Sequence, residues 1–138
     1  MDAEVVAEAF RRQPDFDSAK LFIDPTGREV VYETERASDD AFSVAHAVIE
    51  LSVPHFHADR TEVYTALDNN ASVIVNGERY DLRRGQEFVI KPGQVHWVRA
   101  SDPTNPAHIM VRCTPAWTPN DHHVVPVSAI IYGPSARA

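Results

Sequence analysis

The chain has little of what several classes of protein require. It contains one cysteine, Cys113, among 138 residues, so an intrachain disulfide is excluded and a reducing cytoplasm is the expected location. No apolar run approaches the roughly 20 residues that a membrane-spanning helix needs. Residues 1–4 carry acidic and no basic side chains, unlike a secretory signal peptide. We therefore expect a cytoplasmic protein with no membrane partner, in which Cys113 is a small buried apolar residue.

Clustered positive charge is also missing. The formal net charge is −7, and the basic pairs at 11–12 and 83–84 stand alone. A surface that binds nucleic acid needs Lys and Arg gathered on one face. The sequence therefore excludes nucleic acid as an expected partner.

Turn signals and short apolar runs make up most of the chain. Asp24-Pro25-Thr26-Gly27 and Asn76-Gly77 are strong turn sequences. Strands separated by such turns predict an all-β sandwich or barrel, and the length suits one domain. The expected strands are 20–23, 28–32, 42–51, 62–67, 72–75, 78–82, 87–90, 95–99 and 108–113.

Three histidines and a glutamate form the most informative pattern. His55 and His57 are two positions apart, so on a strand both rings would lie on one face, about 7 Å apart at the backbone. Glu62 follows shortly, and His96 comes after a turn at residues 91–93. Imidazole and carboxylate ligands suit Fe, Mn, Ni, Cu or Zn rather than Ca or Mg. A set of four can leave coordination positions open for catalysis.

The first three of these residues resemble the first cupin motif, Gly-x5-His-x-His-x3-4-Glu-x6-Gly. His55, His57 and Glu62 match it, whereas Ile49 and Asn69 stand where its two glycines would be. The asparagine is a mild change because Asn tolerates left-handed backbone conformations. Neither departure removes a ligand.

The second cupin motif, Gly-x5-Pro-x-Gly-x2-His-x3-Asn, is also matched in part. Gly85, Gly93 and His96 fall at the right offsets, while Lys91 replaces the proline and Ala100 the asparagine. These departures affect loop geometry and leave the ligand in place. With the strand pattern around it, the resemblance extends over residues 40–115.

The resemblance implies a small cupin β-barrel, the jelly roll or double-stranded β-helix. We expect one domain over residues 1–138, with the N-terminal helix and strands in 1–40 and the barrel core in 41–115. A C-terminal extension would cover 116–138. Both motifs would line the barrel mouth, where His55, His57, Glu62 and His96 would bind one divalent transition metal per chain. Fe or Mn is favoured, with Ni, Zn and Cu as alternatives.

The resemblance also implies an enzyme that acts on a small, oxygen-chelating organic substrate. Among the activities of the family, a dioxygenase-type oxidoreductase is favoured. Two alternatives stay open, since a fold does not select a reaction. One is a metal-dependent isomerase, cyclase or lyase, and the other is a non-catalytic protein that binds a small molecule or sugar.

Further residues are assigned by their strand positions. Tyr64 shares a strand face with Glu62, so it is expected either to join Glu62 in catalysis or to pack in the barrel. Phe88 and Ile90 are expected to form the apolar wall of the pocket. Trp97 alternates with His96 and should point away from the metal, into the core between the sheets or a dimer contact.

Four further polar residues lie outside the two motifs. His46 could contact substrate or a ligand, but a structural role is favoured. Arg112 could face an anionic substrate, although an outward position is favoured. The pair His122-His123 lies in a polar region, so surface exposure is expected for both.

The N-terminal segment is expected to form a short amphipathic helix over residues 2–12. Val5, Val6, Ala9 and Phe10 would share its apolar face, and Pro14 would stop it. An apolar helix face on so small a barrel, together with the family resemblance, leads us to expect a homodimer.

Overall fold

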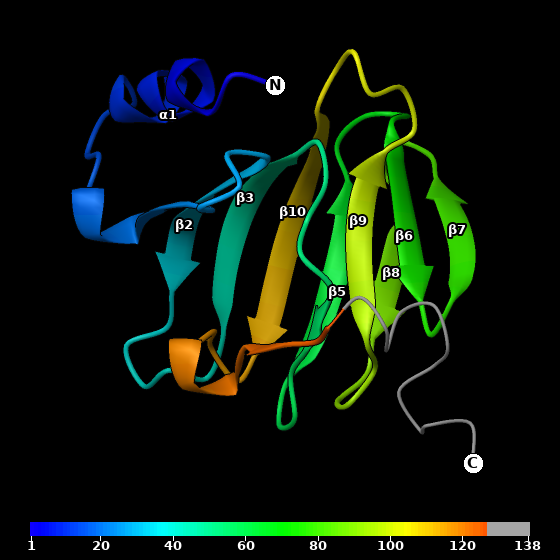
Figure 1. Cartoon of the computed structure of the whole chain (residues 1–138). Coiled ribbons are helices and arrows are strands. Elements are labelled where there is room, and N and C mark those ends of the chain that lie inside the picture. Colours follow the sequence, from blue (N-terminus) through cyan, green and yellow to red (C-terminus); the bar gives the residue numbers. More distant parts are fainter. Residues whose placement is uncertain (127–138) are drawn as a thin grey trace.

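Two antiparallel sheets face each other in the computed structural model, which describes residues 1–126 (Figure 1). The six-stranded sheet has the spatial order β1 (Leu21–Ile23), β2 (Glu29–Arg36), β3 (Ser43–Ile49), β10 (Ala107–Thr114), β5 (Thr61–Ala66) and β8 (Glu87–Ile90). The five-stranded sheet has the order β11 (His123–Val124), β4 (His55–Phe56), β9 (His96–Ala100), β6 (Ala71–Val75) and β7 (Glu78–Leu82). The chain thus has the predicted all-β cupin barrel.

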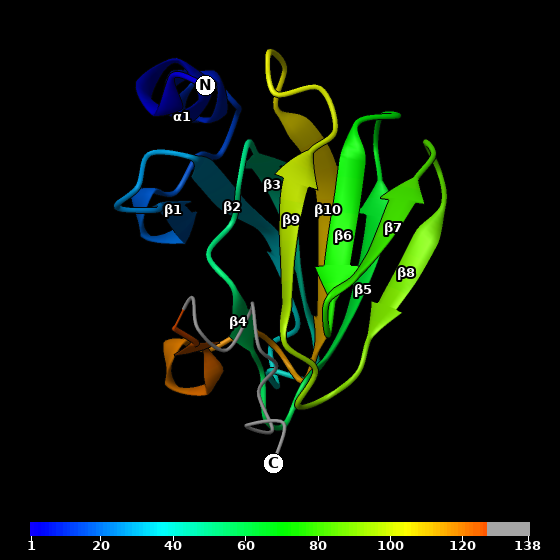
Figure 2. The same cartoon turned by 45° about the vertical axis from the view of Figure 1, so that its right-hand side comes forward.

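Figure 2 shows the two sheets as facing layers, and the core residues lie between them. Side chains alternate along β9, where His96, Val98 and Ala100 are buried and the residues between them are half-buried. β6 and β7 meet at Asn76-Gly77, where both residues have positive φ (49° and 86°). A two-residue hairpin turn of this kind needs such angles. These features place the first residue of β9 inside the barrel.

The sequence located most strands within one or two residues. β7 and β8 match their predicted ranges, and β2 and β10 are longer than predicted. The two-residue strands β4 and β11 were not predicted, and neither were the 3-10 helices Ser18–Lys20 and Pro119–Asp121. Residues 127–138 of the expected C-terminal extension lie outside the described residues.

Helix α1 (Ala3–Arg11) covers the outer face of the six-stranded sheet. Asp2 caps it by accepting hydrogen bonds from the backbone N–H of the next turn. Ala7 and Phe10 are its buried residues, and the Phe10 ring stacks on Tyr32 of β2 at 5.4 Å. The predicted face was therefore partly wrong, since Val5 is 67% exposed. Phe10 is buried by contacts within this chain, with Tyr32 and His46. No helix within residues 1–126 is long and apolar enough to cross a membrane.

His46 and Arg112 both lie on the outside of the barrel. The Nε2 atom of His46 is 3.0 Å from Nδ1 of His108, and its ring packs edge-on against Phe10 at 5.3 Å. Arg112 is exposed, with its guanidinium 4.1 Å from the centre of the Phe42 ring. The structural role favoured for His46 and the outward position favoured for Arg112 are confirmed.

The position of His46 predicts a loss of stability in acid. Burial, and then the neighbouring His108, lower the pKa of His46 from its usual value of 6.5. The unfolded chain takes up a proton at this position as the pH falls below about 6.5, whereas the folded state resists it, so acid favours unfolding. We expect the free energy of unfolding, measured in urea, to fall less steeply from about pH 7 to about pH 5 in His46→Gln than in the wild type. Equal slopes would contradict this assignment.

Candidate metal centre

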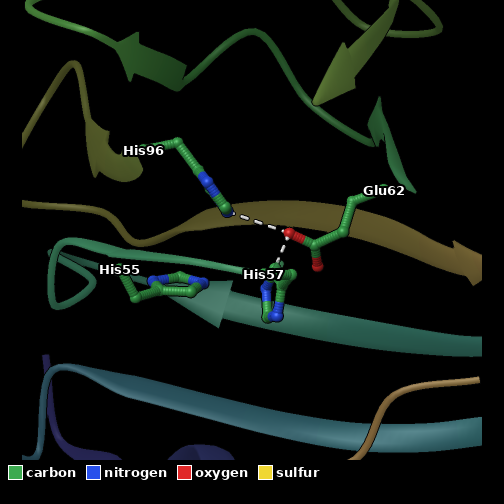
Figure 3. A group of neighbouring side chains, drawn as sticks. All are labelled: His55, His57, Glu62 and His96. Carbon is green, nitrogen blue, oxygen red and sulfur yellow. Dashed lines mark hydrogen bonds and ion pairs between the residues drawn. The ribbon is translucent and has the colours of Figure 1, made fainter. Parts of the chain in front are cut away.

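Four buried side chains meet inside the barrel from three parts of the chain. His55 lies on β4 and pairs in register with His96, the first residue of β9. His57 lies in the loop after β4, and Glu62 is on β5 of the opposite sheet. In Figure 3, the side chains of His57 and His96 reach the Glu62 carboxylate from different directions. The four predicted ligands are therefore brought together.

Their donor atoms are close enough to share one ion. One ligand atom from each residue lies within 4.8 Å of all the others. Oε1 of Glu62 is 2.9 Å from Nε2 of His96 and 3.1 Å from Nε2 of His57. All four residues are buried, with exposed fractions between 0% for His96 and 8% for His55.

A hydrogen bond from Nδ1 to a backbone carbonyl fixes the orientation of each histidine ring. Nδ1 of His55 is 2.7 Å from the carbonyl of Val53, and Nδ1 of His96 is 2.9 Å from that of Gln94. Nδ1 of His57 is 2.6 Å from the carbonyl of Asp121. A carbonyl can only accept, so Nδ1 carries the proton and the neutral ring has its lone pair on Nε2. Each ring therefore turns a ligand atom toward the centre, as metal-binding histidines do.

The protonation states of His55 and Glu62 also suit a cation. Burial, and then His96 and His122, lower the pKa of His55 to about 3, so its ring is neutral. Burial opposes ionisation of Glu62, but the adjacent His57 and His96 outweigh it and hold its pKa well below the usual range. Burial lowers the pKa of His57, but Glu62 and Asp121 outweigh it and the net shift is upward. Within residues 1–126, His57 Nε2 is buried without an aligned hydrogen-bond partner. A bound metal ion would use that lone pair, so the residues fit the group.

Two protonated side chains contact the Glu62 carboxylate. The Tyr64 hydroxyl lies 3.5 Å from Oε1, and the Cys113 thiol donates to Oε2 at 3.4 Å. Burial, followed by the charge of Glu62, raises the pKa of both groups. Tyr64 therefore faces inward as a proton-bearing group. The buried position predicted for Cys113 is confirmed, but its contact with Glu62 was not foreseen.

Asp121 braces the loop that carries His57. It is 5% exposed and lies in the second 3-10 helix. Its carboxylate accepts the backbone N–H of Ala58 at 2.7 Å and of Asp59 at 3.0 Å, and it pairs with Arg60 at 2.8 Å. Because its own carbonyl also holds His57, one residue fixes the ring and the following loop.

The predicted surface position of His122 was wrong. Its ring stacks on His55, with ring centres 4.3 Å apart, and it lines the cavity beside the metal centre. His123 is exposed, as predicted, and stacks on Phe56 at 4.9 Å. The two side chains differ in exposure because His122 is extended and leads directly into β11, which pairs with β4. Adjacent residues of an extended segment point to opposite sides. The Asp121-His122-His123 run was the sequence signal that could have indicated this contact.

A cavity of about 400 Å³ opens beside the metal centre. Its apolar wall comes mainly from β2, β3 and β10, and not from β8 as predicted. The wall residues are Val31, Ala45, Ala47, Ile49 and Val111. Phe88 and Ile90 pack in the core between the sheets instead. Trp97 points away from the cluster as predicted, but it is half-buried on the outer face and not in the core.

Comparison with known proteins identifies the domain. The family model described as "Cupin domain" matches residues 46–113, which contain all four ligand candidates. No curated protein sequence matches this chain. The chain thus carries a cupin domain, as its two motifs predicted.

Similar solved structures share the fold at low sequence identity. KdgF from Halomonas sp. has a TM-score of 0.61 and 14% identity over 72% of this chain and 88% of that one. Pac13, a nucleoside dehydratase, has a TM-score of 0.62 and 11% identity over 82% of this chain and 91% of that one. Ectoine synthase from P. lautus has a TM-score of 0.58 and 17% identity over 74% and 73% of the two chains.

Because Asp121 holds both the His57 ring and the following loop, we expect metal affinity to depend on this residue although it is not a ligand. The two carboxylate oxygens of Asp121 now accept hydrogen bonds from two backbone N–H groups and from Arg60. Asp121→Asn leaves one acceptor oxygen for these donors. We expect metal affinity to fall about 10- to 100-fold, the usual effect of losing a group that orients a ligand. Competition with a fluorescent chelator measures this affinity. The control is Asp59→Asn, which changes an exposed neighbour. Equal affinities in the two variants would show that Asp121 does not position His57.

Proposed function

We propose that this protein is a metal-dependent enzyme that acts on a small organic substrate bound through its oxygen atoms. The observation that carries the proposal is the convergence of three histidines and one carboxylate at the wall of a substrate-sized cavity. Binding pockets for small molecules are typically apolar with a few converging polar groups, as this one is. One ion per chain is expected, with Fe or Mn favoured. When bound, such an ion polarises a substrate oxygen and stabilises negative charge on it.

The remaining residues of the cavity suit proton transfer. Tyr64 keeps its proton, because burial and then the charges of Glu62 and Glu29 raise its pKa well above the usual range. Its hydroxyl can therefore donate a hydrogen bond to a substrate oxygen. His122 lines the same cavity, and its Nδ1 is buried without a hydrogen-bond partner within residues 1–126. A donor and an acceptor beside one substrate are what an elimination, isomerisation or cyclisation needs.

We therefore favour a lyase, isomerase or cyclase. Two proteins of similar fold, Pac13 and ectoine synthase, are named as a dehydratase and a synthase, which supports this choice. The dioxygenase predicted from the resemblance is the second candidate. Its support is the ligand set, which suits iron.

Metal content tests the first part of the proposal. Protein purified without added metal should contain about one divalent transition metal per chain by elemental analysis. The double variant His55→Ala, His96→Ala should lose it, whereas His108→Ala, which removes the histidine beside His46 on the outside of the barrel, should keep it. Glu62→Gln should stay folded and bind more weakly, because it removes the negative charge of the cluster. Full occupancy in the folded double variant would overturn the site.

The metal requirement of turnover separates the two reaction classes. Protein loaded with zinc or with iron can be screened against hydroxy acids, keto acids and catechols, with product analysis and an oxygen electrode. Proton-transfer chemistry predicts turnover with either metal and no oxygen uptake, because zinc has no redox chemistry. Oxygen consumed in proportion to product, with iron alone, would instead establish the dioxygenase.

A further inference from the structure

Glu29 is a carboxyl group in the cavity that the metal centre does not use. It begins β2, where alternate residues face opposite sides of the sheet. Val30 and Tyr32 are buried beneath helix α1, whereas Glu29 and Val31 line the cavity. The strand thus presents an acidic side chain to the space that a substrate would occupy.

The Glu29 carboxyl makes no side-chain hydrogen bond or ion pair with any other residue in 1–126. The other acid that lines the cavity from β2, Glu33, is paired with Arg36 at 2.7 Å. Arg36 also pairs with Asp40 at 2.8 Å, so its guanidinium is already engaged. Lys20 lines the cavity too, but it is exposed at the rim. A partly buried carboxyl without a partner is costly when ionised, and it favours a ligand that supplies the missing charge.

The surroundings keep this group neutral when the cavity holds no ligand. Burial is the main cause, and the charges of Asp24 and Glu62 add to it, raising the pKa of Glu29 to about 8. The neighbouring Tyr64 is also protonated, so it adds no charge. A ligand ammonium placed against Glu29 would reverse the effect, because an adjacent positive charge favours the carboxylate.

We propose that Glu29 binds the ammonium group of a small amino acid whose oxygen-bearing end is held at the metal centre. This inference rests on the proposed function and names the substrate class of the same site. Glu29 and Val31 pair in register with Ile49 and Ala47, so the acid is flanked by apolar residues of the cavity wall that accommodate a short hydrocarbon segment. Glu29 is a binding and specificity residue in this arrangement.

The first test uses matched ligands on the zinc-loaded protein. Isothermal titration calorimetry compares straight-chain amino acids, from 3-aminopropanoate to 6-aminohexanoate, with carboxylates of the same length that lack the amine. At the length that spans the cavity, we expect the amino acid to bind about tenfold more tightly in the wild type. Glu29→Gln should lose this preference and still bind the plain carboxylate. Glu35→Gln, which changes an exposed acid on the same strand, should behave as the wild type.

Proton release supplies a second measurement. Burial, the largest cause of the raised pKa of Glu29, remains when zinc offsets the charge of Glu62. Binding of the amino acid at about pH 7 should therefore release a proton from Glu29, seen as a dependence of the binding enthalpy on the ionisation enthalpy of the buffer. Glu29→Gln should abolish that release. A preference that is absent, or that survives in Glu29→Gln, would overturn this inference and leave the metal proposal intact. If neither kind of acid binds the zinc-loaded protein, oxygen chelation at the metal fails and this inference fails with it.

Discussion

The hydrogen bonds from three imidazole Nδ1 atoms to backbone carbonyls determine what this barrel can bind. They join His55 to Val53, His57 to Asp121 and His96 to Gln94. Without them the rings could rotate, and the lone pairs on Nε2 would not meet. Two of the acceptors lie two residues before their histidine, so local turns are enough to place them. The third lies far along the chain, and for this reason the segment that contains Asp121 belongs to the metal centre.

Charge in the interior is balanced around Glu62. It is the only acid in the cluster of four, and Tyr64 and Cys113 contact it in their protonated forms. Ionisation of either neighbour would place a second negative charge beside Glu62 in a buried site, so both pKa values are raised. The neutral histidines and the single carboxylate would leave a divalent cation with net positive charge, which suits an oxygen ligand. Glu29, further along the cavity, has no such partner within residues 1–126.

The sequence was informative where the signal is local. The hairpin at Asn76-Gly77 and the alternation along β9 specify turns and strand faces from neighbouring residues alone. Motif spacing likewise identified His55, His57, Glu62 and His96, because each of the two motifs is a short continuous segment that carries its ligands at fixed offsets. Ala7, a buried residue of helix α1, was not predicted. The apolar pattern of the helix is also satisfied by Val5, and only contact with the sheet decides which of the two is buried.

The part of the site that was missed depends on contacts between distant segments. β4 and β11 have two residues each, too few for a recognisable pattern, and they are strands because β4 pairs with β9 and β11 pairs with β4. That pairing brings His122 onto His55 and Asp121 under the His57 loop. The pocket wall was assigned to Phe88 and Ile90 of β8 because pockets for small molecules are mostly apolar. The packing of the two sheets decides which strands line the cavity beside the cluster. Sequence spacing does not predict that packing.

The most direct test of the account is the ligand set of the bound metal. X-ray absorption spectroscopy on the metal-loaded protein identifies imidazole ligands by multiple scattering from the ring, and thiolate sulfur by its heavier scattering and longer bond. We expect three imidazoles, with the remaining ligands, Glu62 among them, from light atoms and none from sulfur, because the Cys113 thiol keeps its proton. A sulfur ligand at about 2.3 Å, or fewer than three imidazoles, would contradict the arrangement on which the proposed function rests.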